Sequence, residues 1–170
     1  MKKWIQLFLV CTLFLTTSGC AKKQEYTEIP VTMDEVQEMM DHQEDFILLV
    51  ERENCSFCQR LHDYIEETKK EHNDVTIYIL DTTEFHFKKE SQDSNILAAE
   101  TEEGKAFLKE FPYFMYTPSI YVISSGDATV VGSGFDATTK EISLWDVDSV
   151  IDFNRANVQN FWSYVEEADQ

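Results

Sequence analysis

The sequence predicts a single α/β domain of three layers, built around a central mixed sheet. Its 170 residues include 43% hydrophobic residues but only 5 Gly and 3 Pro, which is typical of a folded globular domain. Apolar, strand-like runs alternate with amphipathic helical segments along most of the chain. The last of these runs enters a hairpin turn at residues 125–127. Strands that alternate with helices and end in a hairpin imply helices on both faces of one sheet.

Two helix–strand pairs account for the first half of the chain. Residues 32–35, Thr-Met-Asp-Glu, have the form of a capping box, and apolar residues then recur at helical spacing, so we expect a helix over 33–43. The continuous apolar run at 46–50 predicts a buried strand. A second helix is expected to begin at the cysteines and end near residue 72, before a second buried strand at 75–80.

The second half of the chain is less regular, and its expected elements rest on shorter patterns. Pro112 ends one helical region, and a Gly-containing turn separates two strands. The expected elements are a helix over 85–99, a helix over 102–111, a strand over 119–123, a hairpin strand over 128–131, a loop over 133–145 and a final amphipathic helix over 147–165.

The N-terminal segment has the features of an export signal. Lys2 and Lys3 precede an apolar run at 4–15, which is too short to span a bilayer and has the length of a signal-peptide core. The small residues before Cys20 resemble a bacterial lipobox, although Thr17 occupies the position that is usually Leu. We therefore expect a signal peptide at 1–19, a lipidated Cys20 with a tether at 20–29, and a domain at 30–170. An ordinary secretory signal is the alternative; both place the domain outside the cytoplasm, and the lipobox predicts a lipid anchor in the cell membrane.

The charge balance restricts the partners of the protein. Lys and Arg number 14 against 32 Asp and Glu, which gives a net charge of −18. This balance excludes a nucleic-acid partner, since phosphate binding needs clustered cations, and it also argues against holding an anionic membrane through a basic surface. Cleavage before Cys20 would remove two lysines and leave −20. Such a surface can attract cationic partners.

The cysteines indicate redox chemistry. Of the four, Cys11 lies in the signal segment and Cys20 at the lipid site, which leaves Cys55 and Cys58 for the domain. A strand before the pair and a helix after it place Cys55 at a helix N-terminus, where the helix dipole stabilises a thiolate. Cys55 is then expected to be the nucleophile, and Cys58, one turn later and more buried, the resolving thiol.

A Thr-Pro pair at the start of the third strand completes a family resemblance. The strand, the CxxC that opens a helix, and Thr117-Pro118 before a hairpin resemble the thioredoxin fold over residues 30–168. The resemblance implies a cis Pro118 packed beside the cysteines, and a Thr117 whose backbone meets an extended substrate peptide. The stretch between Cys58 and Pro118 is longer than in a minimal thioredoxin, which implies an inserted helical segment before the Thr-Pro loop. With its lipobox, the chain is similar to the bacteriocin transport accessory proteins of Gram-positive bacteria.

The chain departs from that family at the residues around the cysteines. Many thioredoxins carry a buried Asp six residues before the first Cys, and here that position is Leu49. Glu51 and Glu53 are close by, and we expect both to be exposed. The dipeptide between the cysteines is Ser-Phe, which lacks a cation and suggests an intermediate redox poise. Phe57 is a candidate substrate contact.

Other interpretations of these residues stay open at this point. Cys55 and Cys58 can form a purely structural disulfide, although so short a loop gains little stability. With His62 they form C-x2-C-x3-H, but structural zinc needs four ligands, so His62 is more simply a helix-surface residue. The aromatic cluster Phe111, Tyr113, Phe114 and Tyr116 packs in the core or lines a peptide site.

Together these features predict an extracytoplasmic thiol–disulfide oxidoreductase that acts on cysteines of exported proteins or peptides. No cofactor is expected, because the cysteine pair itself holds the electrons, and a membrane redox partner is implied. The direction of electron flow and the oligomeric state stay open. A non-catalytic binding lipoprotein with an idle disulfide is the main alternative, and a metallochaperone is a third.

Overall fold

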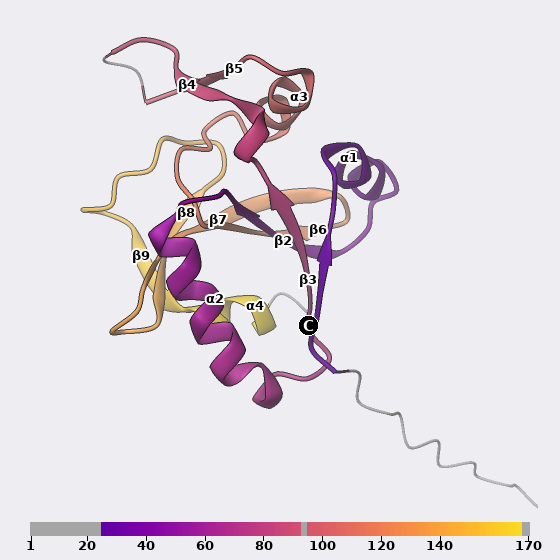
Figure 1. Cartoon of the computed structure of the whole chain (residues 1–170), viewed down its shortest axis with the longest axis vertical. Coiled ribbons are helices and arrows are strands. Elements are labelled where there is room, and N and C mark those ends of the chain that lie inside the picture. The colour runs from indigo at the N-terminus through magenta and orange to yellow at the C-terminus, as the bar shows by residue number, and fades with distance from the viewer. Residues whose placement is uncertain (1–24, 93–94, 168–170) are drawn as a thin grey trace, which may run out of the picture.

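The computed structural model describes residues 25–92 and 95–167, and within these ranges seven strands form one mixed sheet (Figure 1). The strand order is β1-β3-β2-β6-β7-β8-β9. Strands β1, β3 and β2 are parallel to one another, and every later neighbour is antiparallel. The strands are β1 (Thr27–Pro30), β2 (Phe46–Glu51), β3 (Thr76–Asp81), β6 (Ser119–Ser124), β7 (Asp127–Asp136), β8 (Glu141–Asp146) and β9 (Asn157–Asn160).

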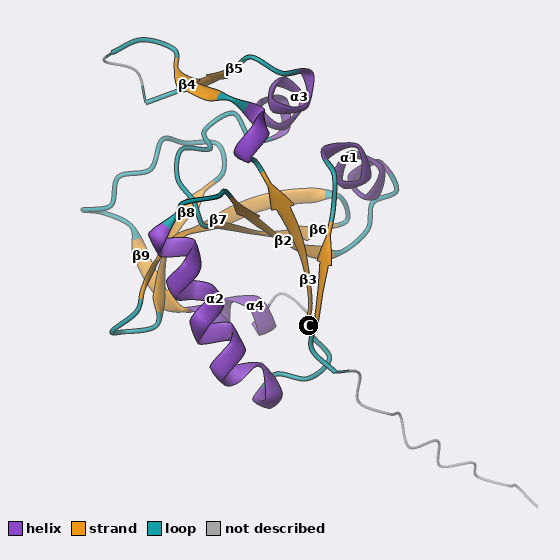
Figure 2. Ribbon diagram, viewed as in Figure 1, coloured by secondary structure: helices purple, strands orange, loops and turns teal. Residues whose placement is uncertain are grey.

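The four α-helices of the described ranges cover the two faces of this sheet (Figure 2). Helices α1 (Met33–Asp41) and α3 (Glu102–Glu110) lie on one face, while α2 (Ser56–Thr68) and α4 (Phe161–Glu167) lie on the other. Short 3-10 turns occur at Lys69–Glu71 and Thr83–Phe85. The expected three-layer α/β class is confirmed.

The alternation of side chains along β2 divides the core in two. Phe46, Leu48 and Val50 belong to the cluster under α1 and α3. Ile47 and Leu49 belong to the cluster under α2 and α4. Because successive strand residues point to opposite faces, the next odd-numbered residue, Glu51, shares the α2 face with Leu49.

The elements predicted in the first half of the chain are present. Thr32 caps α1 through its hydroxyl, and the Glu35 carboxylate accepts from the Thr32 backbone N–H, so the capping box is complete. The Thr32 backbone N–H, and then the Thr32 hydroxyl, donate to the Glu35 carboxylate and lower its pKa. The predicted helix at 102–111 and the third strand at 119–123 also match α3 and β6 within a residue.

The helix expected over 85–99 is wrong. This segment forms a separate pair of short strands, β4 (Phe87–Lys89) and β5 (Leu97–Ala99), which pair antiparallel next to α3. The Phe87 ring packs on Phe107 of α3. Gly104 of α3 permits this approach, because a Cβ there would collide with Ala99 and with the backbone of Phe85.

The loop expected over 133–145 is also wrong. The hairpin strand β7 continues to Asp136, and β8 returns along it. Gly132 lies within the sheet, where a Cβ would collide with the Ile142 side chain. The turn that follows is closed by the Asp136 carboxylate, which accepts the N–H groups of Thr138 and Thr139.

Only the end of the helix expected over 147–165 is helical. Residues 157–160 form β9, and α4 begins at Phe161. Val147 packs with the core under α1 and α3, whereas Phe161 and Val165 pack under α2 and α4. The apolar residues whose spacing resembles that of one helix therefore pack on two opposite faces of the sheet.

The N-terminal boundary differs from the expected one. Strand β1 begins at Thr27 and pairs with β3, so the last residues of the expected tether at 20–29 belong to the sheet. The expected signal peptide at 1–19 and Cys20 lie outside the described residues. Within residues 25–92 and 95–167, no helix has the length and apolarity needed to cross a membrane.

Candidate active site

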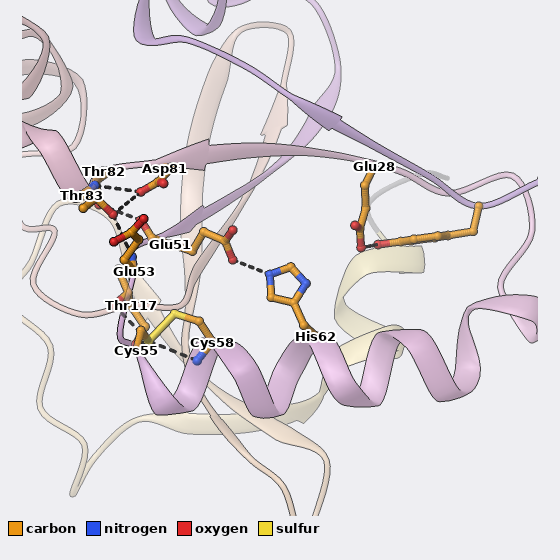
Figure 3. A network of polar contacts seen from close by, with 11 residues as sticks. Glu28, Glu51, Glu53, Cys55, Cys58, His62, Asp81, Thr82, Thr83 and Thr117 are labelled. Atoms are coloured by element: carbon orange, nitrogen blue, oxygen red, sulfur yellow. Dashed lines mark hydrogen bonds and ion pairs between the residues drawn. A yellow bond between two sulfur atoms is a disulfide. The ribbon is translucent and has the colours of Figure 1, made fainter.

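Cys55 and Cys58 form a disulfide at the start of α2, beyond the end of β2 (Figure 3). Their Cα atoms are 5.3 Å apart, within the usual range for bridged cysteines. Cys55 is the N-cap residue, and its Sγ accepts the Cys58 backbone N–H at 3.1 Å. Cys55 is partly exposed, whereas Cys58 is only 4% exposed. Both positions agree with the sequence prediction.

The loop that joins β2 to the cysteines is fastened to the end of β3. The Thr82 hydroxyl donates to the Glu51 carbonyl at 2.8 Å, and the Glu53 N–H donates to the Thr83 hydroxyl at 2.8 Å. The Asp81 carboxylate in turn accepts from the Thr83 N–H and hydroxyl. Figure 3 shows this chain of polar contacts running from β3 to the loop above the disulfide. The position of Cys55 is therefore fixed by two strands as well as by its own helix.

Thr117 and Pro118 lie against Cys55, 62 residues away in sequence. The Thr117–Pro118 peptide bond is cis, and Pro118 is buried at the start of β6. The Thr117 hydroxyl donates to Cys55 Sγ at 3.3 Å, and its carbonyl oxygen is 3.4 Å from the same sulfur. Gly134 of β7 holds the loop by donating its N–H to the Pro118 carbonyl at 2.9 Å. The structure thus brings together Cys55, Cys58, Thr117 and Pro118.

An apolar groove of about 520 Å³ opens next to Cys55. Phe57 and Thr117 are the lining residues closest to Cys55, and we call this part of the groove its inner end. Residues of β7, β8 and β9 form the rest of its wall. Within the described part of the chain, six large apolar side chains are exposed, and four of them line this groove: Phe57, Tyr116, Phe153 and Val158. An exposed apolar concentration of this kind is typical of a binding surface.

Phe57 lies at that inner end and is 50% exposed. The guanidinium of Arg60, one turn later in α2, stacks over its ring at 4.3 Å. The Tyr116 and Phe153 rings meet edge to face with centroids 5.0 Å apart. The aromatic cluster before Thr117 is thereby divided: Phe111 and Phe114 are in the core, while Tyr116 lines the groove. Sequence patterns did not identify Phe153 or Val158, because both lie in the segment that we expected to be helical.

Two carboxylates add negative charge to the groove lining, those of Asp136 and Glu141. The N–H groups of Thr138 and then Thr139 donate to the Asp136 carboxylate and lower its pKa. Asp136 therefore stays ionised through neutral pH. The groove thus combines aromatic surface with fixed negative charge.

A second cavity, of about 560 Å³, lies beside the disulfide and is lined mainly by charged and polar residues. Cys55 and Cys58 line it together with Glu51 and His62. His62 Nε2 is 2.5 Å from a Glu51 carboxylate oxygen, and the Glu51 side chain is only 21% exposed. This hydrogen bond to Glu51 raises the pKa of His62, against the opposing effect of burial.

The expectation that Glu51 is exposed was wrong, since its side chain is 21% exposed. His62 does lie on the surface of α2, at 33% exposure, and it pairs with Glu51 there. The sequence contained the signal: Glu51 shares strand parity with Leu49, and His62 follows Cys58 by four residues on a helix. Among the described residues, no cluster of three or more His, Cys, Asp or Glu side chains is arranged to hold a metal ion.

No protein-family model and no curated protein matches the sequence. Three solved structures similar to this chain are thioredoxin structures. One is spinach chloroplast thioredoxin f in its short form, at 15% identity, 87% coverage of this chain, 96% of that chain and a TM-score of 0.48. A chain from a complex of ferredoxin:thioredoxin reductase with thioredoxin f2 has 11% identity, coverages of 66% and 86%, and a TM-score of 0.45. Oxidized thioredoxin O2 from Arabidopsis thaliana has 13% identity, the same coverages and a TM-score of 0.43.

Because these scores lie below 0.5, the description of the fold rests on this chain's own topology. Parallel β1, β3 and β2 continue into antiparallel β6 and β7. The CxxC disulfide opens the helix after β2, and a cis proline opens β6. The chain has a thioredoxin-like α/β fold, extended by β8 and β9 and by the β4–β5 insertion.

Proposed function

We propose that the protein is an extracytoplasmic thiol–disulfide oxidoreductase that acts on cysteines of exported proteins or peptides. One observation carries the proposal: the Cys55–Cys58 disulfide caps α2, Cys55 is partly exposed, and its Sγ contacts Thr117. The Cys58 N–H and the Thr117 hydroxyl both point at this sulfur. Hydrogen bonds to a sulfur favour its anionic form, which is the nucleophile in disulfide exchange.

The exchange requires only the two cysteines and the substrate. When the reduced protein meets a substrate disulfide, the Cys55 thiolate attacks one substrate sulfur, and the other substrate sulfur leaves as a thiolate. The Cys58 thiol then loses its proton and attacks Cys55 Sγ, which releases the first substrate sulfur. Two electrons pass from the cysteine pair to the substrate, and the released thiolates take up two protons. The reverse sequence oxidises a substrate dithiol.

The groove supports an extended peptide as the substrate. Thr117 contacts Cys55 and also lines the groove, so a peptide that passes Thr117 can continue along Tyr116 and Phe153. A large apolar side chain close to the substrate cysteine would cover the exposed rings there. We propose that Phe57 is a substrate contact at the inner end of this groove.

The location and the partners follow from the sequence features. Residues 1–19 and Cys20 support export and a lipid anchor on the outer face of the cell membrane. A membrane redox partner would then reset the cysteine pair, with no cofactor in the protein itself. The resemblance to bacteriocin transport accessory proteins makes small cationic disulfide peptides the proposed substrates.

The reduction potential of the pair, measured by equilibration in glutathione buffers, tests the function and its direction. A value near about −120 mV would support disulfide donation to exported substrates, and one near about −270 mV would support reduction or isomerisation. Cys55→Ser should abolish turnover of a disulfide substrate in the full chain. A value below about −300 mV, together with no turnover by the unaltered protein, would contradict the proposal.

The apolar groove also supports a second candidate, a peptide-binding lipoprotein with an idle disulfide. Alkylation at neutral pH after mild reduction separates the two. A reactive Cys55 should be labelled much faster than Cys58, whereas an idle pair should resist mild reduction and label slowly at both positions.

A further inference from the structure

Cys58 must release a proton that bulk water reaches poorly. Its side chain is 4% exposed, and the exchange requires it to ionise when it attacks Cys55 Sγ and to be reprotonated when it leaves. Leu49, on the same sheet face as α2, offers no titratable group. A proton acceptor for Cys58 therefore has to come from elsewhere in the same cavity.

Glu51 and His62 occupy that cavity from two different elements. His62 follows Cys58 by one helical turn, so both side chains lie on one side of α2. Glu51 lies on β2 with the parity of Leu49, which directs it to the α2 face. Figure 3 shows the Glu51 carboxylate and the His62 ring above α2, on the side to which Cys58 points. All three line the one polar cavity.

The electrostatics favour proton exchange near neutral pH. The hydrogen bond to Glu51 raises the pKa of His62 above its ordinary value of about 6.5. Proton transfer is most effective between groups of similar pKa at the working pH. The charged groups that face the cysteine and the imidazole come from β1, β2, the following loop, α2 and β3: Glu28, Glu51, Arg52, Glu53, Asp63 and Asp81. Of these, Glu51 is the one that bonds the imidazole.

We propose that the Glu51–His62 pair accepts the Cys58 proton when Cys58 attacks Cys55, and returns it when Cys58 leaves. The proton passes between the Cys58 thiol and the pair through solvent in the cavity, and it resides on the His62 imidazole against the Glu51 carboxylate. No electron moves to the pair. The two electrons stay with the sulfur atoms, as in the exchange described above. This inference rests on the proposed function, because the exchange is what ionises Cys58.

The test follows the ionisation of Cys58 directly. In the full chain with Cys55→Ala, the 13Cβ resonance of Cys58 is followed by NMR as the pH is changed. Because this resonance belongs to one residue, its titration is read separately from those of Cys11 and Cys20. Glu51→Gln removes a negative charge and should lower the ionisation midpoint of Cys58 by about one unit. His62→Gln leaves the carboxylate without its cation and should raise the midpoint. Glu53→Gln, which removes the same charge from the lining of the same cavity, is the matched control and should have a smaller effect.

Opposite shifts in the two variants, each larger than the Glu53→Gln shift, support the proposal. A shift in the same direction, or one no larger than the control, overturns it, because loosened packing would move both midpoints alike. If either variant does not fold, the His62 ring is titrated in Cys55→Ala and in Cys55→Ala with Cys58→Ala. If the His62 titration shows a second step that disappears when Cys58 is replaced, the proposal is supported; identical His62 titration curves in the two variants overturn it. If the unaltered protein turns over no disulfide substrate, the result instead counts against the oxidoreductase function.

Discussion

The two cavities beside the Cys55–Cys58 disulfide have opposite chemistry. The groove next to Cys55 exposes four large apolar side chains, including Phe57 and Phe153. The cavity that reaches Cys58 is lined by charged and polar groups, including Glu51 and His62. Both use strands of the same sheet, since β7, β8 and β9 line the groove and the ends of β2 and β3 line the polar cavity.

This contrast separates two requirements of disulfide exchange. Cys55 needs a nearby surface that binds the substrate peptide and leaves the substrate cysteine free to react. Apolar contacts can supply this affinity. The resolving thiol needs a place for its proton, which apolar surface does not provide. We infer that the groove determines which peptide binds and that the polar cavity determines at which pH the pair reacts.

The largest expected effect on turnover comes from replacing the buried cysteine, Cys58. Cys58→Ser should leave Cys55 able to attack but unable to be released, so a mixed disulfide with substrate should accumulate on Cys55. Turnover should fall by about a thousandfold or more, since resolution is lost. Non-reducing electrophoresis with peptide mapping measures the adduct. An equal adduct on Cys58 in Cys55→Ser would show that the two sulfurs are not distinguished as we infer.

Shortening the groove wall should produce an intermediate effect. Phe153→Ala removes a ring that is 47% exposed and should raise KM for a peptide with an aromatic residue near its cysteine by about tenfold, equivalent to about 1.4 kcal/mol. The kcat should change little. Ile29→Ala, at another exposed apolar residue on the opposite edge of the sheet, is the control. Equal effects from both variants would remove the groove from the substrate site.

Added salt should lower the reaction rate of cationic substrates but not of neutral ones, and by a smaller factor than the changes above. The net charge of −18 should speed the encounter with a cationic peptide at low ionic strength. Because the screening length falls from about 30 Å at 0.01 M to about 8 Å at 0.15 M, the second-order rate should fall severalfold. Stopped-flow rates with a cationic peptide and its neutral analogue measure this. A flat rate for the cationic peptide would contradict steering.

The smallest expected effect is on stability. The raised pKa of His62 in the folded protein means that its pair with Glu51 stabilises the fold below about pH 6.5, where the unfolded His is also protonated. This contribution is lost as pH rises through the folded-state pKa. His62→Gln should therefore lower the free energy of unfolding at pH 5.5 by at most about 1 kcal/mol, and by less at pH 9. Urea denaturation at both values measures it, and an effect that grows with pH would contradict the pairing.

The sequence predicts the parts of this protein whose signals are local. The Thr32–Glu35 capping box is a four-residue pattern, and α1 begins where it requires. The apolar run 46–50 needs no partner to be recognised as a buried strand, and it is β2. The cysteine spacing and Thr117-Pro118 likewise indicate their elements. That Cys55 and Thr117 are in contact follows from the fold that these motifs together predict.

The elements that were missed depend on long-range pairing. Strand β7 continues through Gly132 because β8 pairs with it and the Ile142 side chain fills the space that a Cβ would need. Of residues 147–165, Val147 packs in one core and Phe161, Trp162 and Val165 pack in the other, so their helical spacing does not correspond to one helix. The Glu51–His62 pair lies between these cases, since strand parity and helix spacing indicate each residue separately but not their contact.

The wall of the groove has a consequence for how this protein can change. Phe153 belongs to the connection between β8 and β9, outside every described strand and helix, whereas the cysteines and Thr117-Pro118 lie at the starts of α2 and β6. Replacing that connection would leave the redox pair, its proton acceptors and the parallel strands intact. Under the proposed function, a different connection at this point would change which peptides bind and would leave the Cys55–Cys58 chemistry unchanged.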